Sequence, residues 1–418
     1  MRIIADLHIH SKYSRATSPE MNIQGLAKWA KIKGIGLVGT GDFTHPQYLK
    51  ELKQKLKPLG NGLFEFEGVK FLLSAEVSNI FQQGGLKKTH HVILAPGFEE
   101  AEQLNDRLAK WGNLAADGRP IFGSRSASEL VELVMETSPS FFIIPAHVWT
   151  PWFSLFGANS GFDSVKECYG DMEKHIHALE TGLSSDPAMN WRLSALDKYS
   201  LVSNSDAHSP SKLGREANVF EFREASYREL TDTLKTKDKS RFLLTYEFYP
   251  EEGKYHFDGH RGCSIRFSPE ESKKHKNKCP VCRKELTIGV MHRVNELADR
   301  EPGFTPKNSV PFQSLVPLQE ILSEAIGKGP GTKKVEEEYW KLIKKFGNEL
   351  EALHASEEAI ASLSGERIAR GIANVRAGKV RVLPGYDGVY GVVSVFGNEK
   401  KTDEPTDSDS KQSSLGDF

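Results

Sequence analysis

Asp6-Leu7-His8-Ile9-His10 follows a short apolar segment at the start of the chain, and Ser205-Asp206-Ala207-His208 repeats its pattern of acid and histidine. Residues 2–7 favour a β-strand, on which alternate side chains point to the same side. Asp206 and His208 have the same spacing after a second apolar segment. Imidazole and carboxylate groups that converge from two strand ends are typical of a hydrolytic metal site. The two stretches therefore predict a metal centre on a β-containing scaffold.

Length and composition narrow the class of protein. The chain of 418 residues exceeds the usual size of one domain, so two or three domains are expected. A formal net charge of −1 gives no overall field that favours nucleic acid or a membrane, so any DNA contact must come from local basic clusters. The sequence shows no signal peptide and no apolar run that could span a bilayer, and four cysteines do not make a disulfide framework. These features predict a cytoplasmic protein that does not bind membranes.

Residues 1–245 alternate short apolar strands with amphipathic helices. This alternation predicts a mostly parallel α/β barrel or sheet, with the chemistry at the carboxyl ends of the strands. The expected strands are residues 2–7, 35–40, 70–74, 92–95, 141–146, 178–180, 201–203 and 242–245. The expected helices are residues 23–33, 47–57, 99–111, 126–137, 187–197 and 226–235.

The rest of the chain divides into three parts by composition. Residues 246–300 are rich in Lys, His and Cys and poor in long apolar runs. Residues 301–396 are expected to be mainly helical and to end in a short β-unit. The expected helices of this part are residues 318–326, 333–346, 349–355, 357–363 and 366–377. Residues 397–418 are polar and of low complexity, which is typical of a disordered tail.

Most of the expected strands of residues 1–245 lie next to a residue that can bind a metal. These residues are Asp42, Glu76, His90, His91, His147, Asp206 and His208. The nitrogen and oxygen donor atoms of these side chains suit Zn²⁺, Mn²⁺ or iron. Any one of them alone would be an ordinary structural histidine or a solvated acid. Their recurrence at strand ends predicts one shared site.

Cysteine spacing indicates a second metal site. Cys279-Pro280-Val281-Cys282 is a C-x2-C knuckle, and Cys263 supplies a third thiolate upstream. His260 completes a Cys₃His set of the kind that binds structural zinc, with His256 and His292 as rivals for the fourth position. The alternative interpretation is three unrelated reduced cysteines. We therefore expect α/β architecture with a small zinc-binding module at residues 246–300 and a helical C-terminal region.

The last residues, Gln412-Ser413-Ser414-Leu415-Gly416-Asp417-Phe418, match most of the box by which DNA enzymes dock on the sliding clamp, proliferating cell nuclear antigen. On a short 3₁₀ turn Leu415 and Phe418 would share one side and fill an apolar pocket, with Gln412 hydrogen-bonding beside them. The motif lacks a second terminal aromatic residue. The alternative is a polar terminus with chance spacing.

The motifs of residues 1–245 resemble those of the polymerase and histidinol phosphatase (PHP) superfamily, whose members are distorted α/β barrels that hydrolyse phosphoesters with two or three metals. The ligands that this resemblance implies are His8, His10, Asp42, Glu76, His91, His147, Asp206 and His208. Asp42 stands where many members have His, and Ser14-Arg15-Ala16 occupies a stretch that often holds one more His. The resemblance therefore implies two metals, with Glu76 as a bridge, and leaves a third open.

The expected chemistry is attack by a metal-activated water on a phosphoester. Zn²⁺ is the expected active-site metal, with Mg²⁺ or Mn²⁺ as alternatives that support activity. The residues expected to carry the catalysis are His8, His10, Glu76, Asp206 and His208.

Over the whole chain, the metal-binding domain, zinc module, helical region and tail together resemble the endonuclease Q family of archaea. The segments that carry this resemblance include residues 147–153 and 255–261. It implies a monomeric, nucleoid-associated DNA repair endonuclease. Such an enzyme nicks double-stranded DNA on the 5′ side of uracil, hypoxanthine, xanthine or an abasic site.

A lesion reader extrudes a nucleotide and stacks it on apolar or aromatic groups. Trp149, Trp152 and Phe153 follow His147 on a loop that we expect to overhang the metals, and Ser160 further along could hydrogen-bond a base edge. An equal alternative is a lid that only packs.

Basic side chains around the zinc knuckle, among them Lys274 and Arg283, favour a grip on the DNA backbone over a merely solvated face. Two other functions stay open. A small-molecule phosphatase of the histidinol phosphate type would use the same metal site but leave the zinc module and tail without a role. A non-catalytic clamp-associated DNA-binding protein would keep its function after His8→Ala or Asp206→Ala.

Overall fold

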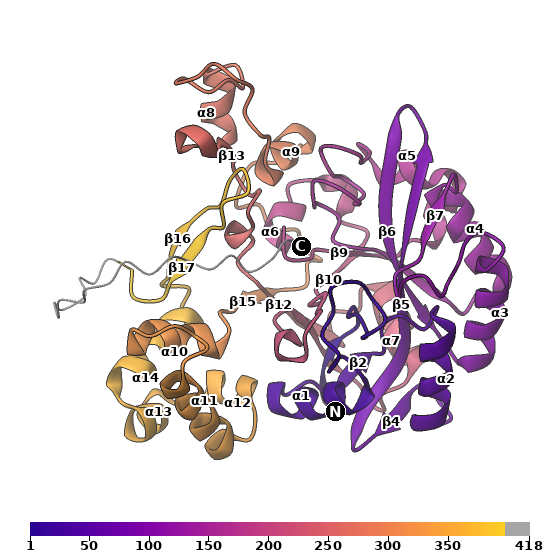
Figure 1. Ribbon diagram of the computed structural model, residues 1–418, viewed down its shortest axis with the longest axis horizontal. Helices are drawn as coiled ribbons and strands as arrows, with labels where there is room; N and C mark the ends of the chain where they lie inside the picture. The colour runs from indigo at the N-terminus through magenta and orange to yellow at the C-terminus, as the bar shows by residue number, and fades with distance from the viewer. Residues whose placement is uncertain (398–418) are drawn as a thin grey trace.

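The structure, a computed structural model, describes residues 1–397 as an α/β part, a small projecting lobe and a bundle of helices (Figure 1). The main sheet has eleven strands. They are β1 (Arg2–Asp6), β2 (Leu37–Gly39), β3 (Lys57–Pro58), β4 (Phe64–Phe66), β5 (Val69–Gln82), β6 (Leu86–Ala95), β7 (Ile121–Gly123), β8 (Phe142–Pro145), β11 (Ala217–Glu221), β12 (Phe242–Glu247) and β15 (Phe312–Ser314). The order along the sheet is β15-β12-β11-β1-β2-β5-β4-β3, and β6, β7 and β8 branch from it through β5 and β6.

A separate parallel pair, β9 (Ala178–Glu180) and β10 (Ser200–Val202), lies between β8 and β11. Beyond β8, the Val148 N–H donates to the carbonyl of Glu180 over 3.0 Å. Beyond β10, the Ser203 N–H donates to Asn218 Oδ1 on β11, and Asn218 Nδ2 donates back to the Ser203 carbonyl. These contacts join β9 and β10 to both neighbouring strands.

Five helices beside the sheet lie close to where the sequence predicts them, whereas the helix at Val165–Tyr169 was not predicted and the one that begins at Pro187 ends at Asn190 instead of residue 197. They are α1 (Ile23–Lys33), α2 (Pro46–Lys55), α3 (Phe98–Leu108), α4 (Ala127–Thr137), α5 (Val165–Tyr169), α6 (Pro187–Asn190) and α7 (Tyr227–Thr236). α1 begins at Asn22, whose side chain accepts from the Gly25 N–H, and ends at Gly34 in the left-handed conformation. α4 begins at a capping box of Ser126 and Glu129. These local signals explain why the predicted bounds of α1 and α4 are close to the observed ones.

The prediction of a mostly parallel sheet is wrong. β5 and β6 form one long antiparallel hairpin, where the sequence suggested two short separate strands. The turn between them contains Gly84 and Gly85, both at positive φ, which a glycine adopts without steric cost. The β1–β11, β6–β8 and β11–β12 pairs are also antiparallel. The sheet is therefore mixed.

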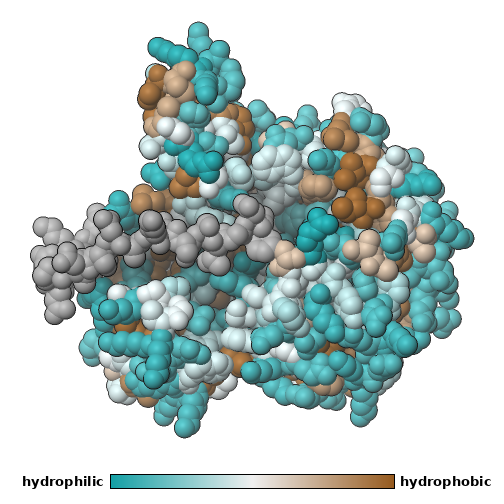
Figure 2. Space-filling view, in the orientation of Figure 1, coloured by the Kyte–Doolittle hydropathy of each residue, from teal (hydrophilic) through white to brown (hydrophobic). Residues whose placement is uncertain are grey.

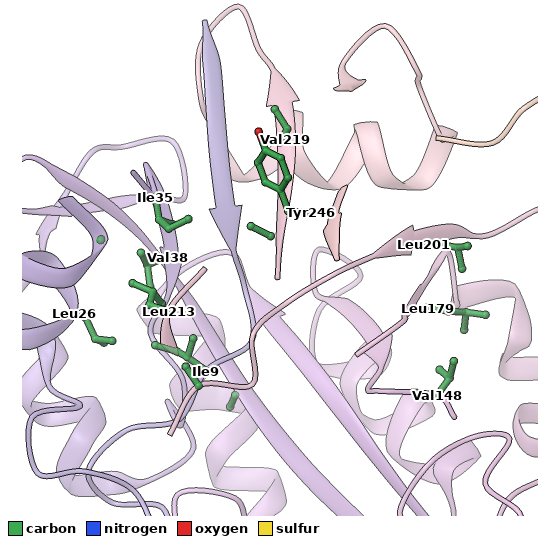
Figure 3. Close-up of a cluster of buried hydrophobic side chains, with 14 of the residues drawn as sticks. Ile9, Leu26, Ile35, Val38, Val148, Leu179, Leu201, Leu213, Val219 and Tyr246 are labelled. Atoms are coloured by element: carbon green, nitrogen blue, oxygen red, sulfur yellow. The ribbon is translucent and has the colours of Figure 1, made fainter. Parts of the chain in front are cut away.

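The apolar core fixes the direction of the first motif. Ile9 is fully buried and lies near Leu213 and Val38 in the cluster drawn in Figure 3. It also pairs with Ala207 in a parallel bridge. Because alternate residues of an extended segment point to opposite sides, burial of Ile9 turns His8 and His10 away from this cluster. Packing thus holds the two motifs side by side.

The lobe and the helical bundle follow the α/β part. The lobe contains β13 (Asp258–His260), β14 (Ile265–Phe267), α8 (Pro269–Lys274) and α9 (Val290–Leu297). Figure 2 shows a notch between this lobe and the α/β part. The bundle and its hairpin are α10 (Leu318–Ile326), α11 (Lys333–Phe346), α12 (Glu349–His354), α13 (Glu357–Ser364), α14 (Glu366–Arg376), β16 (Arg381–Leu383) and β17 (Val392–Ser394).

The bundle is tied to the α/β part. β15 pairs with β12 in the main sheet, and Lys33 on α1 forms a 2.6 Å ion pair with Glu349 on α12. Within residues 1–397, no helix is both long and apolar enough to cross a bilayer. The predicted clamp motif at Gln412, Leu415 and Phe418 lies outside the described residues.

Candidate metal centre

The structure brings four of the predicted ligands, His8, His10, Glu76 and Asp206, into one cluster. His10 Nε2 lies 3.1 Å from both Glu76 Oε2 and Asp206 Oδ1. His8 Nε2 lies 3.6 Å from Glu76 Oε2 and 3.7 Å from Asp206 Oδ1. His8 Nε2, His10 Nε2 and Asp206 Oδ1 are buried and have no hydrogen-bond partner of acceptable geometry. Buried lone pairs that converge in this way suit a metal ion.

A second group shares Glu76 with the first. Its other carboxylate oxygen, Oε1, lies 2.6 Å from His90 Nδ1 and 3.0 Å from His147 Nε2. The two imidazole nitrogens are 3.2 Å apart. Glu76 therefore stands between two ligand groups, the arrangement expected of a bridge between two metals.

His91 was predicted as a ligand, but the structure places His90 in the cluster instead. In the β5–β6 ladder His90 pairs with Ser78 and His91 with Val77, so His90 shares the face of Glu76 and His91 takes the opposite one. His91 Nε2 hydrogen-bonds the hydroxyl of Tyr169 over 2.8 Å. The sequence alone does not show the register of the hairpin, so it could not tell which of the two histidines faces Glu76.

Two buried carboxylates orient the histidines of the first group. His8 Nδ1–H donates to Glu180, whose two oxygens both lie 3.0 Å away. His10 Nδ1–H donates to Asp42 Oδ1 over 3.1 Å. These two hydrogen bonds at Nδ1 leave the Nε2 lone pair of each ring free to bind a metal. Asp42, predicted as a ligand, is therefore placed behind one, where it also accepts from the N–H and hydroxyl of Ser11.

Three residues of the site have a strained backbone. Asp42, His147 and Asp206 have φ values of +47°, +31° and +48°, which non-glycine residues seldom adopt. At Gly182 a Cβ would stand 2.5 Å from the Cβ of His147, so this loop needs glycine to approach the histidine. Such strain is concentrated at functional sites, where the surrounding structure holds it in place.

Negative charge dominates the electrostatics of the cluster. Burial opposes protonation of His8, but Glu180, Glu76 and Asp206 together raise its pKa well above the ordinary histidine value. Burial also opposes ionisation of Glu76, yet His90, Arg119 and His8 hold its pKa well below the usual range. The site therefore attracts positive charge, which a bound cation would supply. Burial lowers the pKa of His90 to about 4, which keeps its ring neutral and able to act as a ligand.

Two residues sit at the margin of the cluster. The ring of His208, a predicted ligand, lies 4.5 Å from that of His10, and its Nδ1 is 3.8 Å from Asp206 Oδ1. His208 therefore lies beside the group of His8, His10, Glu76 and Asp206 but is not one of its members. The sequence did not predict Arg119 as a site residue. Arg119 Nη1 lies 3.1 Å from Glu76 Oε2, and about a third of the arginine side chain is exposed. Nothing near Arg119 in the sequence signals this role.

The first motif also has a structural acid. Asp6 does not reach the metal ligands. It accepts from the N–H groups of Ser205 and Gly214 over 3.0 Å and 2.9 Å. Asp6 therefore ties the second motif to the end of β1.

The predicted zinc ligands meet in the lobe. His260, Cys263, Cys279 and Cys282 form one group, and His260 Nδ1 lies 3.6 Å from Cys282 Sγ. The rivals for the histidine position lie outside this group: His256 is buried elsewhere, and His292 Nδ1 bonds Asp258 over 2.6 Å. Burial raises the pKa of the Cys279 thiol, but the N–H groups of Cys282 and Val281 outweigh it and bring the pKa to about 7. These features fit a thiolate metal site.

The predicted base-contacting loop divides into buried and exposed residues. Trp149 is buried, and its indole N–H donates to Asn190 over 2.8 Å, so it packs in the core and cannot stack on a base. Ser160 is also buried. Phe153, at φ +58°, lies 4.8 Å from the ring of His90, and Trp152 is 44% exposed. On the lobe, Lys274 and Arg283 are exposed.

Comparison with known proteins finds one matching family model and two uncharacterised relatives. Residues 317–379 match the family model described as MJ0043 C-terminal domain. The uncharacterised protein YqxK of Bacillus subtilis is 30% identical over 409 residues, which are 94% of this chain and 99% of that protein. The uncharacterised protein MJ0043 of Methanocaldococcus jannaschii is 36% identical over 256 residues, 59% of this chain. The chain spans 31% of the length of MJ0043.

Solved structures identify the family. The lesion-specific endonuclease PfuEndoQ from Pyrococcus furiosus is 34% identical, with a TM-score of 0.85 over 96% of this chain and 98% of that one. The chain belongs to the endonuclease Q family. A second structure is Endonuclease Q in complex with a 27-mer duplex substrate that has an abasic lesion at the active site. It is also 34% identical, with a TM-score of 0.83 over 94% of this chain and 96% of that one. Membership of the endonuclease Q family thus rests on nearly the whole chain.

Proposed function

We propose that this protein is a metal-dependent DNA repair endonuclease that hydrolyses the phosphodiester 5′ to a deaminated base or an abasic site. The observation that carries the proposal is the double ligand group around Glu76, in a chain that aligns almost completely with endonuclease Q bound to an abasic duplex. The proposal includes nicking beside uracil, hypoxanthine and xanthine.

The donor sets fit two divalent cations. His8, His10, Glu76 and Asp206 would hold one, and Glu76, His90 and His147 the other. Bound metals would lower the pKa of a coordinated water and neutralise phosphate oxygens during in-line attack. Zn²⁺ suits these nitrogen-rich sets, and Mg²⁺ or Mn²⁺ are alternatives for activity.

Residues around the ligands have their own parts in the reaction. Arg119 presents a partly exposed guanidinium beside Glu76, where it would bind a phosphate oxygen of the scissile group. Glu180 and Asp42 hold His8 and His10 in one tautomer and orientation. The strained loops at His147 and Asp206 keep these groups in place before the substrate arrives.

Other parts of the chain extend the proposal. The contacts of β9 and β10 with both neighbouring strands favour a distorted barrel in residues 1–245. The group at His260, Cys263, Cys279 and Cys282 favours structural zinc in a module at residues 246–300, followed by a helical domain to residue 396. Docking on the sliding clamp through Gln412, Leu415 and Phe418 stays a prediction from the sequence.

Defined duplexes test the proposed function. Each carries one uracil, hypoxanthine or abasic site in a labelled strand. With Mg²⁺, Mn²⁺ or Zn²⁺ added, we expect one nick on the 5′ side of the lesion and none in the undamaged duplex, as resolved on a denaturing gel. Absence of a strand-specific nick with all three metals would sink the proposal. Turnover of small phosphomonoesters without DNA affinity would instead favour a phosphatase.

Glu180→Gln tests the role of the carboxylate behind His8. Glutamine keeps the size of the side chain but can turn an N–H group toward His8 Nδ1 and disturb its tautomer. We expect the affinity for Mn²⁺ and the nicking rate to fall about 10- to 100-fold, measured by calorimetric titration and by gel assay. Glu173→Gln, at an acid that pairs with Lys198 away from the cluster, is the control and should change neither quantity. If Glu180→Gln binds Mn²⁺ with wild-type affinity, Glu180 does not orient His8 for metal binding.

A further inference from the structure

A row of aromatic and cationic side chains leads away from the metal cluster. The row consists of Trp152, Tyr255, Lys254 and Tyr390. The rings of Trp152 and Tyr255 are 5.5 Å apart in an edge-to-face arrangement. Lys254 Nζ lies 5.9 Å from the ring of Tyr255 and 5.8 Å from that of Tyr390. We name this set the aromatic row.

The row begins at the active site and ends on the β16–β17 hairpin. Next to Trp152 in the chain, Phe153 packs against His90 of the second ligand group. At the other end, Tyr390 follows a turn in which Asp387 accepts from the N–H of Arg261 over 2.6 Å. The backbone also joins the two parts, because the Phe257 N–H donates to the Gly385 carbonyl over 2.9 Å. The row is therefore a fixed surface that three separate segments build together.

The ends of the row are open to solvent. Trp152 is 44% exposed and Tyr390 is 70% exposed, both unusually high values for large aromatic side chains. Leu383 and Val392 on the same hairpin are also exposed, at 37% and 56%. Exposed apolar groups that continue an active site indicate a binding surface.

Charge on the surface favours a polyanion. Lys254 is part of the row, and Arg261 lies near Tyr255 at Gly388. On the hairpin, the Pro384 carbonyl accepts from Arg266 over 3.2 Å, and Arg381 begins β16. The acid in the turn, Asp387, is held by the Arg261 N–H and the hydroxyl of Thr287. Alternating rings and cations match the bases and phosphates of a nucleic acid strand.

We propose that the aromatic row binds unpaired nucleotides of the DNA strand beside the cleavage point. Trp152 and Tyr390 stack on bases, and Lys254 contacts the backbone between them. The occupant is unpaired, because ring stacking needs a base face that a continuous duplex hides. This inference rests on the proposed function, since the bound strand continues from the one that is cut.

The test measures binding of full-length protein to a fluorescein-labelled ten-nucleotide oligothymidylate by fluorescence anisotropy. This probe has no lesion and is not a substrate. We expect Trp152→Ala and Tyr390→Ala each to weaken binding roughly 5- to 100-fold. Trp152→Phe should recover most of the affinity because it keeps a stacking ring. Phe304→Ala removes another exposed aromatic, which lies under Arg300, and should bind like the wild type.

The inference is overturned if both alanine variants bind oligothymidylate with wild-type affinity, or if the wild type does not bind it measurably. It is also overturned if, in the same assay with an intact duplex as the probe, the alanine variants lose affinity only for that duplex. The last result would assign the row to duplex DNA. The lesion-duplex nicking assay on the wild type separates the two proposals. If the wild type nicks and the alanine variants bind oligothymidylate normally, only the aromatic row is wrong. If the wild type does not nick, the proposed function fails whatever the row binds.

Discussion

Glu76→Gln is expected to lower the rate of lesion-specific nicking at least about 1,000-fold. Glu76 Oε2 faces His10, and Oε1 faces His90 and His147, so one carboxylate serves both ligand groups. Glutamine has nearly the same volume but lacks the charge, and its amide nitrogen cannot act as a ligand. The loss should therefore reach both metal positions at once.

Metal content gives a second readout of Glu76→Gln that does not depend on activity. Elemental analysis of the purified variant should show less bound metal than the wild type, while the zinc that we propose for the lobe is retained. The matched control is Glu136→Gln, which removes the same charge at an exposed ion pair with Arg107. It should match the wild type in rate and metal content. A Glu76→Gln enzyme within ten-fold of the wild-type rate would exclude the bridging role.

Where local signals were sufficient, the residues that the sequence grouped together also lie together in the structure. The sequence could place His8, His10 and Asp206 together because each stands two positions from another His or Asp beside an apolar strand, a spacing that puts their side chains on one side. The group of His260 and the three cysteines could be predicted because C-x2-C spacing restricts the chain by itself. Helix bounds such as Ile23–Lys33 followed from an N-cap and a C-terminal glycine.

The strand that carries Glu76 shows why other parts of the site could not be predicted from the sequence. β5 runs on from Val69 to Gln82, but Ser74, Glu76 and Ser78 interrupt its apolar pattern, so the prediction ended it at residue 74. These polar residues are tolerated inside the sheet because they face the site. Because these polar residues serve the site, the sequence pattern hides the full length of the strand. It therefore also hides the pairing register with β6, which puts His90 and His91 on opposite faces.

Some contacts depend on long-range packing that no local pattern encodes. Arg119 reaches Glu76 from a loop that precedes β7, and Glu180 reaches His8 from β9. Trp149 looked like a base-stacking residue because it follows His147, yet the fold buries it against Asn190. Its neighbour Trp152, three positions on, is the exposed one. Sequence spacing alone cannot decide which side of an irregular loop faces solvent.

Cys279→Ser is expected to unfold the lobe and leave the α/β part intact. β13 and β14 have three residues each and α8 has six, so the lobe buries little apolar surface of its own. Small zinc units draw roughly 10–16 kcal/mol from the metal, which is more than such a core supplies. Because Cys279 is fully buried at the centre of the ligand group, its loss should release the zinc. Trypsin should then cut the lysine-rich segment around α8 at least ten-fold faster, as followed by mass spectrometry.

The control for this variant is Cys168→Ser, at a buried cysteine of the α/β part that belongs to none of the three ligand groups. It should keep the lobe zinc and the slow digestion of the lobe, even if its own buried site is weakened. Comparing released zinc between the two serine variants separates loss of a ligand from loss of a thiol. Cys279→Ser protein that retains its zinc and resists trypsin like the wild type would show that the lobe folds without the metal. The three cysteines would then be unrelated neighbours, the alternative that the sequence left open.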